Sequence, residues 1–186
     1  MIDIVTTLLA ALTVLGQGIV LVSLGIVLYA RFLAKKSITK FPMTIYIMLN
    51  SRKFAFGVAV IAVVGSLFYS EIAGYEPCKL CWIQRIFMYP LIYVIGGNLS
   101  GNDRHTVRTS YIASLLGALV AGYHYYLQRT QTHGIIPCSV MGYSVSCSEV
   151  FRMTFGYITI PLMAFTAFCL ILLFTYLSTF SHTSKP

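Results

Sequence analysis

Charge is scarce in this chain. Only 10% of its 186 residues are charged and just five are acidic, whereas 58% are hydrophobic and the mean hydropathy is +0.80. A water-soluble domain of this size cannot bury that much apolar surface. The composition therefore excludes a soluble globular domain and predicts a membrane protein.

The sequence also lacks the short alternating segments, about ten residues each, that form transmembrane β-barrels. Its charges stand between long apolar runs, which predicts an all-α bundle. A spanning helix needs roughly 20 apolar residues. On that basis we predict five spans: Ile4–Ala30, Phe54–Ser70, Cys81–Ile95, Thr109–Gln128 and Met153–Phe180, the last with Pro161 inside it.

Two apolar segments need separate comment. The first span has no basic region before it and is too long for a cleavable signal peptide, so we expect it to stay in the protein. The run Phe41–Asn50 is too short to span a bilayer. It either lies along the inner interface or extends the second helix.

The net charge of +8 comes largely from one linker between spans. Six of the thirteen basic residues lie there, namely Arg31, Lys35, Lys36, Lys40, Arg52 and Lys53. Such clustering is typical of a cytoplasmic loop and not of a nucleic-acid site. The N-terminus, the 71–81 loop and the 129–152 loop are then expected outside the cytoplasm.

This topology predicts that four of the five cysteines lie on the extracytoplasmic side. Cys78 and Cys81 stand in one outer loop, and Cys138 and Cys147 stand in the next. Disulfides form and persist in that compartment. Cys169 falls within the last span and is expected to act as a small apolar residue.

The first pair forms a C-x-x-C motif with features of a reactive thiol site. Pro77 precedes it, which favours a helix that begins at the motif, where unpaired N–H groups stabilise a thiolate. Arg85 follows Cys81 by four residues and so lies on the same helix face. A positive charge beside a cysteine lowers the pKa of the thiol and makes it reactive.

Two structural alternatives remain open from the residues alone. The four outer cysteines could bind zinc, but their spacing is unlike a zinc ribbon and no histidine stands near either pair in the sequence. They could also form two inert disulfides, as outer-loop cysteines often do. Arg85 favours a functional site, because a charge just inside a span is costly and usually has a role.

Polar residues on other spans are also candidates for ligand binding. His124 and Gln128 are four residues apart near the outer end of the fourth span, so they face the same way. They either bond across helices, which the spacing alone favours, or donate to carbonyl oxygens of a ligand. Gln84 presents the same two alternatives.

The segment from Pro77 to Pro90 (PCKLCWIQRIFMYP) resembles the signature of the DsbB/BdbC disulfide-bond formation proteins, and the BdbC-type branch in particular. Further matches follow in order, at His124–Gln128, Pro137-Cys138, Cys147-Ser148-Glu149, Phe155-Gly156 and Pro161. The resemblance covers roughly residues 52–186 and implies a four-helix transmembrane bundle. Residues 1–51 would then add one N-terminal transmembrane helix and a basic linker that the usual family member lacks.

The resemblance implies a membrane thiol:quinone oxidoreductase of a bacterial or archaeal plasma membrane. A soluble or lipid-anchored thioredoxin-fold thiol oxidase, DsbA/BdbD-like, would pass its electrons to Cys138, which pairs with Cys147. Cys147 would then engage Cys78, and Cys81 would pass the electrons to a quinone, either ubiquinone or menaquinone. Arg85 would assist that step. His124, Gln128 and Gln84 would hold the quinone, with no metal involved.

Two other functions are considered beside this one. A vitamin K epoxide reductase-like enzyme also combines a four-helix bundle, outer thiols and a quinone, but the Gln84-Arg85 continuation of the motif disfavours it. A membrane scaffold or transporter subunit with structural disulfides is the non-enzymatic alternative. It would keep all four outer cysteines oxidised.

Overall fold

The computed structural model describes residues 2–29, 42–99, 103–131, 147–148, 150 and 153–180. Cys138 and Pro137 lie outside the described residues, as does most of the basic linker. Statements about the structure below refer to the described ranges.

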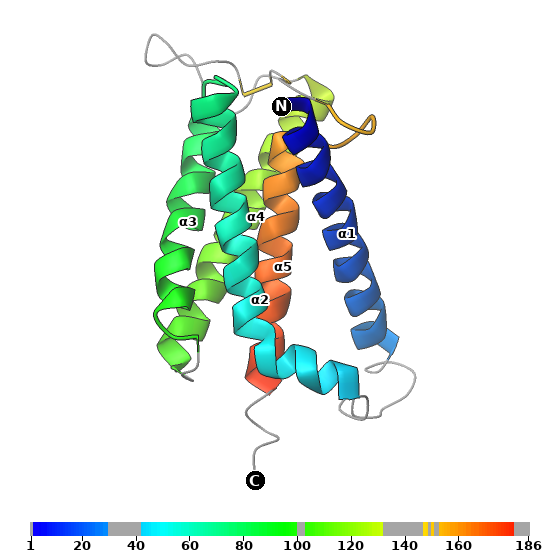
Figure 1. Ribbon diagram of the computed structural model, residues 1–186, viewed down its shortest axis with the longest axis vertical. Coiled ribbons are helices and arrows are strands. Elements are labelled where there is room, and N and C mark those ends of the chain that lie inside the picture. The colour runs from blue at the N-terminus through cyan, green and yellow to red at the C-terminus, as the bar shows by residue number, and fades with distance from the viewer. Residues whose placement is uncertain are drawn as a thin grey trace.

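The described chain is helical. Its elements are α1 (Ile2–Tyr29), α2 (Pro42–Leu67) with a π-helical extension η3 (Phe68–Ile72), α3 (Lys79–Gly96), α4 (Arg104–Thr130) and α5 (Ile160–Phe180). Figure 1 shows the helices side by side, with α5 in the middle. Helix α5 packs against α4, α2 and α1, and α3 packs against α4 and α2. The predicted all-α bundle with an added N-terminal helix is confirmed.

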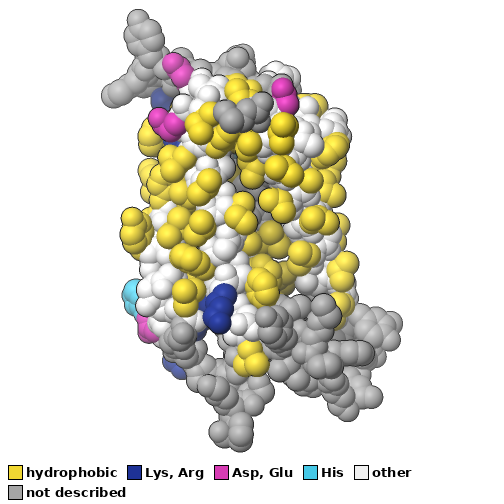
Figure 2. All heavy atoms as spheres, viewed as in Figure 1, with side chains coloured by type: hydrophobic (Ala, Val, Ile, Leu, Met, Phe, Trp, Pro, Cys, Tyr) yellow, Lys and Arg dark blue, Asp and Glu magenta, His cyan; other side chains and the backbone are white. Residues whose placement is uncertain are grey.

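Three helical segments are long and apolar enough to cross a membrane, namely Ile2–Ile26, Leu49–Ile72 and Ile160–Thr179. Helices α3 and α4 carry more polar residues but lie alongside the other three (Figure 1). In Figure 2 hydrophobic side chains are spread over the face between its two ends, and the charged side chains lie toward the ends. The protein is therefore a helical membrane bundle.

The predicted start of the last helix is wrong. Helix α5 begins at Ile160 and not at Met153, so Pro161 stands in its first turn, where the missing N–H needs no partner. The preceding residues form a tight turn closed by a bridge between Thr154 and Ile158. Phe155 and Gly156 have φ values of 52° and 75° there, a conformation that no helix continues through.

The second helix settles the choice left open for the run before residue 50. Helix α2 begins at Pro42 and is continuous through that run, which therefore extends the helix. Figure 1 shows that the first turns of α2 are bent steeply away from the rest. This part of α2 lies at the end of the bundle opposite the start of α3 (Figure 1).

Close contact between α4 and α5 forms the centre of the bundle. Helix α4 buries several small residues, including Ser114, Gly117 and Ala121, and small residues let helix backbones approach each other. Phe168 of α5 fills the space beside Gly117 and is fully buried. A methyl group at Gly117 would lie 2.3 Å from the Phe168 ring.

The substitution Gly117→Ala should therefore destabilise the bundle. Overpacking of a buried site costs about 1–3 kcal/mol, which exceeds the roughly 1 kcal/mol that alanine gains over glycine in a helix. Thermal unfolding of the purified protein in detergent should show a lower midpoint. Gly122→Ala is the control, because its methyl group would lie 3.4 Å from Phe165, an ordinary contact. Equal midpoints for the two variants would contradict the packing described here.

Candidate active site

The C-x-x-C motif begins a helix, as predicted. Cys78 is the N-cap of α3, with extended backbone, and its sulfur accepts a hydrogen bond from the Cys81 N–H at 3.4 Å. The two sulfur atoms lie 3.1 Å apart. Cys78 is buried, with 2% of its surface exposed, and Cys81 is half-buried. A reactive pair thus stands at the positive end of the α3 dipole.

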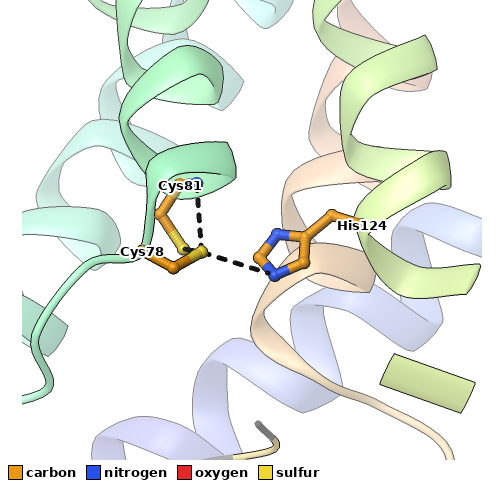
Figure 3. A group of neighbouring side chains, drawn as sticks. All are labelled: Cys78, Cys81 and His124. Carbon is orange, nitrogen blue, oxygen red and sulfur yellow. Dashed lines mark hydrogen bonds between the residues drawn. The ribbon is translucent and has the colours of Figure 1, made fainter. Parts of the chain in front are cut away.

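His124 completes this group from α4, the helix that packs against α3, and its ring faces the two cysteines (Figure 3). Its Nε2 lies 3.6 Å from the Cys78 sulfur, and its Nδ1 lies 2.9 Å from the Gln84 side-chain nitrogen. An amide NH₂ can only donate, so Nδ1 accepts from Gln84. In the neutral ring Nε2 then carries the proton and donates it toward the Cys78 sulfur.

These contacts favour a thiolate at Cys78 in the reduced pair. The hydrogen bond from the Cys81 thiol lowers the pKa of Cys78 most, and the contact with His124 lowers it further, against the opposing effect of burial. Hydrogen bonds to the charged form are an established cause of such a shift. The arrangement makes Cys78 a low-pKa sulfur, which is the better leaving group in disulfide exchange.

Arg85 is fixed between α2 and α3. Its Nε donates to the Ser66 hydroxyl and its Nη2 to the Ser66 carbonyl oxygen, both at 2.9 Å. The guanidinium also lies over the Trp82 ring, 5.2 Å from its centre. These contacts hold the positive charge one turn below Cys81, on the face of α3 that the sequence predicts.

A cavity of about 440 Å³ opens beside the cysteine pair. The lining includes both cysteines and the four predicted polar residues, Gln84, Arg85, His124 and Gln128. Away from this group the lining is mainly apolar and comes from α1, α2 and α5. The structure therefore brings together six of the eight predicted site residues around one cavity.

The second cysteine pair is described only in part. Cys147 is disulfide-bonded and buried, and it packs in one cluster with Cys78, Leu80 and Leu127. The two cysteine loops therefore meet at the same end of the bundle. Cys138, its predicted partner, lies outside the described residues. Cys169 is a free cysteine within α5 and does not line the cavity. Its predicted role as a small apolar residue stays a prediction.

Two contacts that shape the site have no signal in the sequence. Ser66 accepts hydrogen bonds from Arg85, and folding brings His124 against Cys78, which is 46 residues away in the chain. The second contact also weakens the argument against a metal. The ligand atoms of Cys78, Cys81 and His124 lie within 4.8 Å of one another. Two thiolates and an imidazole suit zinc, but a Cys78–Cys81 disulfide would remove two of the three ligands.

Comparison with known proteins gives one consistent result. The family model described as "Disulfide bond formation protein DsbB" matches residues 51–178. Disulfide bond formation protein C of Bacillus subtilis is 42% identical over 118 residues, which cover 63% of this chain and 83% of that protein. A probable disulfide formation protein of Oceanobacillus iheyensis is 41% identical over 113 residues, covering 61% and 77%. No solved structure matches the chain. The resemblance indicated by the cysteine motif is confirmed.

Thiolate absorbance at 240 nm should test the ionisation of the site. In the reduced protein one thiolate should persist below the ordinary thiol range near pH 8.5, because the pKa of Cys78 is lowered. This thiolate absorbance should disappear in Cys78→Ser. In His124→Leu it should titrate at higher pH, because the Cys78 sulfur loses the hydrogen bond from His124. Cys169→Ser should leave it unchanged. Persistence of the low-pH signal in Cys78→Ser would assign it to another cysteine.

Proposed function

Since the chain belongs to the DsbB family of disulfide bond formation proteins, we propose that it is a membrane thiol:quinone oxidoreductase. It reoxidises an extracytoplasmic thioredoxin-fold thiol oxidase of the DsbA/BdbD type and passes the electrons to a membrane quinone. Both cysteine loops face the extracytoplasmic side of a bacterial or archaeal plasma membrane. One observation carries the proposal. The C-x-x-C pair, with Arg85 and His124 beside it, lines a mainly apolar cavity within a membrane bundle.

The cavity residues fit a quinone. A volume of about 440 Å³ lies within the roughly 300–1,000 Å³ of small-molecule sites, which are mostly apolar with a few placed polar groups. Arg85 has five N–H donors, and the described contacts with Ser66 use two of them. Arg85 and Gln128 therefore stand where carbonyl oxygens of a ring would accept hydrogen bonds. His124 lines the same cavity, with its two ring nitrogens turned to Gln84 and Cys78. A bound quinone supplies a two-electron, two-proton acceptor.

The first half of the proposed reaction is thiol–disulfide exchange. A partner thiolate attacks Cys138 of the Cys138–Cys147 disulfide, and the partner's second thiol resolves the mixed disulfide. The partner thus leaves oxidised, and Cys138 and Cys147 become thiols. Each step is a thiolate attack in which one S–S bond forms as another breaks. The extracytoplasmic setting suits such a partner because disulfides persist there.

The second half moves the electron pair between the loops. Cys147 attacks Cys78 of the Cys78–Cys81 disulfide, and Cys81 leaves; Cys138 then attacks Cys147 and releases Cys78. The packing of Cys147 with Cys78 in one buried cluster supports this order. The contacts that stabilise a Cys78 thiolate favour its release. The reduced pair returns to the disulfide by giving two electrons and two protons to the acceptor.

In this step Arg85 would stabilise negative charge, and His124 would donate a hydrogen bond to the Cys78 sulfur. The guanidinium carries a fixed positive charge that stabilises negative charge developing on Cys81 or on the ring oxygens. The Nε2–H of His124 lies beside Cys78 and can donate as the sulfur becomes negative. Gln84 holds the tautomer that this donation needs.

The activity is tested with purified full-length protein, a reduced thioredoxin-fold oxidase and a short-tailed quinone, by following quinone absorbance. Cys81→Ser should lower the rate by at least about a hundredfold, because only a closed pair can take up two electrons. Cys169→Ser is the matched control and should retain the rate. Quinone reduction that persists in Cys81→Ser would refute the proposed route. Turnover of a quinone epoxide without oxidation of the partner would instead indicate the epoxide reductase alternative.

A trapping experiment tests the first exchange separately. In Cys147→Ser, Cys138 is a thiol that can attack the disulfide of the oxidised partner, with one partner thiol as the leaving group. Because Cys147 is absent and cannot displace it, the mixed disulfide between Cys138 and the partner should accumulate on non-reducing gels. Cys138→Ser should abolish the band. A partner that forms no mixed disulfide with either variant would indicate structural disulfides, as in the scaffold alternative.

A further inference from the structure

Helix α1 lies before the segment that the family model matches, yet it is built into the bundle. Gly16 brings α1 close to α5, since a methyl group there would lie 2.8 Å from the Leu170 side chain. Gln17 then donates to the Thr166 hydroxyl at 3.4 Å and accepts from the Tyr157 hydroxyl at 3.1 Å. Polar contacts of this kind join helices in a membrane. Helix α1 is thus seated on α5.

The contact between α1 and α2 is of a different kind. The two helices meet near the outer end, where Leu9 lies against Gly65 and the Thr6 side chain is hydrogen-bonded to Tyr69. Toward the other end α1 diverges from both α2 and α5 (Figure 1), and its contacts with α5 lie in its middle, at Gly16 and Gln17. Figure 2 shows a hollow in the hydrophobic face between α2 and α1.

This hollow belongs to the cavity that reaches the cysteine pair. Its lining runs from Phe54 on α2 to Tyr69 on η3, which is fifteen residue steps and so about 22 Å at 1.5 Å per step. Helix α1 contributes one face to it, with Leu12, Thr13 and Ile19 among the lining residues. Most of this length is lined by apolar side chains, which suit an extended hydrocarbon chain better than a polar ligand.

We infer that α1 forms one wall of a cleft for the isoprenoid tail of the quinone, and thereby makes the enzyme selective for tailed acceptors. The inference rests on the proposed function, because it assigns the rest of the same cavity. One continuous cavity has polar side chains at the cysteine end and apolar ones along α1, α2 and α5. A molecule with a polar ring and a long apolar tail matches both parts at once.

Two other occupants fit the cavity less well. A phospholipid chain would match the apolar part but would place its head group against the cysteine pair. A helix from a second copy would match the apolar part but would bring no group for the polar side chains at the cysteine end of the cavity. The electron acceptor needs no second ligand, because its ring and its tail match the two parts.

The test compares two quinones that share a ring, one without a tail and one with an isoprenoid tail. Ala62 lines the cleft on α2, and Ala62→Phe would fill it. Val64→Phe is the matched control, since Val64 is 60% exposed and does not line the cavity. In Ala62→Phe the ratio of kcat/KM for the tailed quinone to that for the ring-only quinone should fall about tenfold or more, because the tail loses apolar burial. Val64→Phe should keep the wild-type ratio.

A second measurement does not depend on turnover. A quinone with a photoreactive diazirine at the end of its tail should label peptides from α1 or from the Phe54–Ser66 part of α2 in the full-length protein. Labelling should fall in Ala62→Phe and remain in Val64→Phe. Labelling confined to lipid, or to α3 and α4, would overturn the inference.

The outcomes separate the two proposals. If wild-type protein reduces neither quinone while it still exchanges disulfides with the partner, the proposed function fails and this inference falls with it. If both quinones are reduced and Ala62→Phe leaves their ratio unchanged, the proposed function stands and the role of α1 is refuted. A lipid chain in the cleft would give that second result, because it would not distinguish the two quinones.

Discussion

The hydrogen bond between Gln84 and His124 is the contact on which the rest of the site depends. Hydrocarbon offers no solvent partners, so a buried polar side chain must find its partner within the protein. Gln84 occupies one ring nitrogen of His124 and so directs the other at the Cys78 sulfur. The two helices that carry these residues, α3 and α4, are thereby held in the register that the cysteine pair needs. A different tautomer would leave the sulfur facing a lone pair.

The same constraint explains how a positive charge is tolerated beside the pair. An unpaired guanidinium within a bundle would be costly. The Ser66 hydroxyl and carbonyl oxygen both accept hydrogen bonds from the guanidinium, and the Trp82 ring lies against it. These contacts offset the cost of burying the charge. Because Ser66 stands on α2 and Arg85 on α3, the charge is fixed relative to two helices at once. Fixed charges act on a developing anion without first having to reorganise, which is what the proposed electron transfer requires.

Much of the fold and part of the site could be predicted from the sequence, for reasons specific to each residue. Apolar length gives the helices, and Pro77 before the motif gives the start of α3. Helical periodicity alone places Gln128 beside His124. The contact of His124 with Cys78 could not be predicted, because it joins residues 46 apart through tertiary packing. Hydropathy also misplaced the start of α5, since it does not register the left-handed backbone at Phe155 and Gly156.

The two sulfur atoms of the motif stand in different surroundings, and this difference gives the proposed relay its direction. Cys78 is buried in the cluster that contains Cys147, so in the proposed relay exchange with the second loop would take place at that sulfur. Cys81 is less buried and stands one turn above Arg85, on the wall of the cavity. A helix start brings the two sulfurs together without further elements, because the N-cap side chain of Cys78 turns onto the first turn, where it accepts from the Cys81 N–H, and the Cys81 side chain leans back toward the N-terminus. In the proposed relay, the short spacing of the motif would give electrons an entrance at Cys78 and an exit at Cys81 while keeping the two sulfurs 3.1 Å apart.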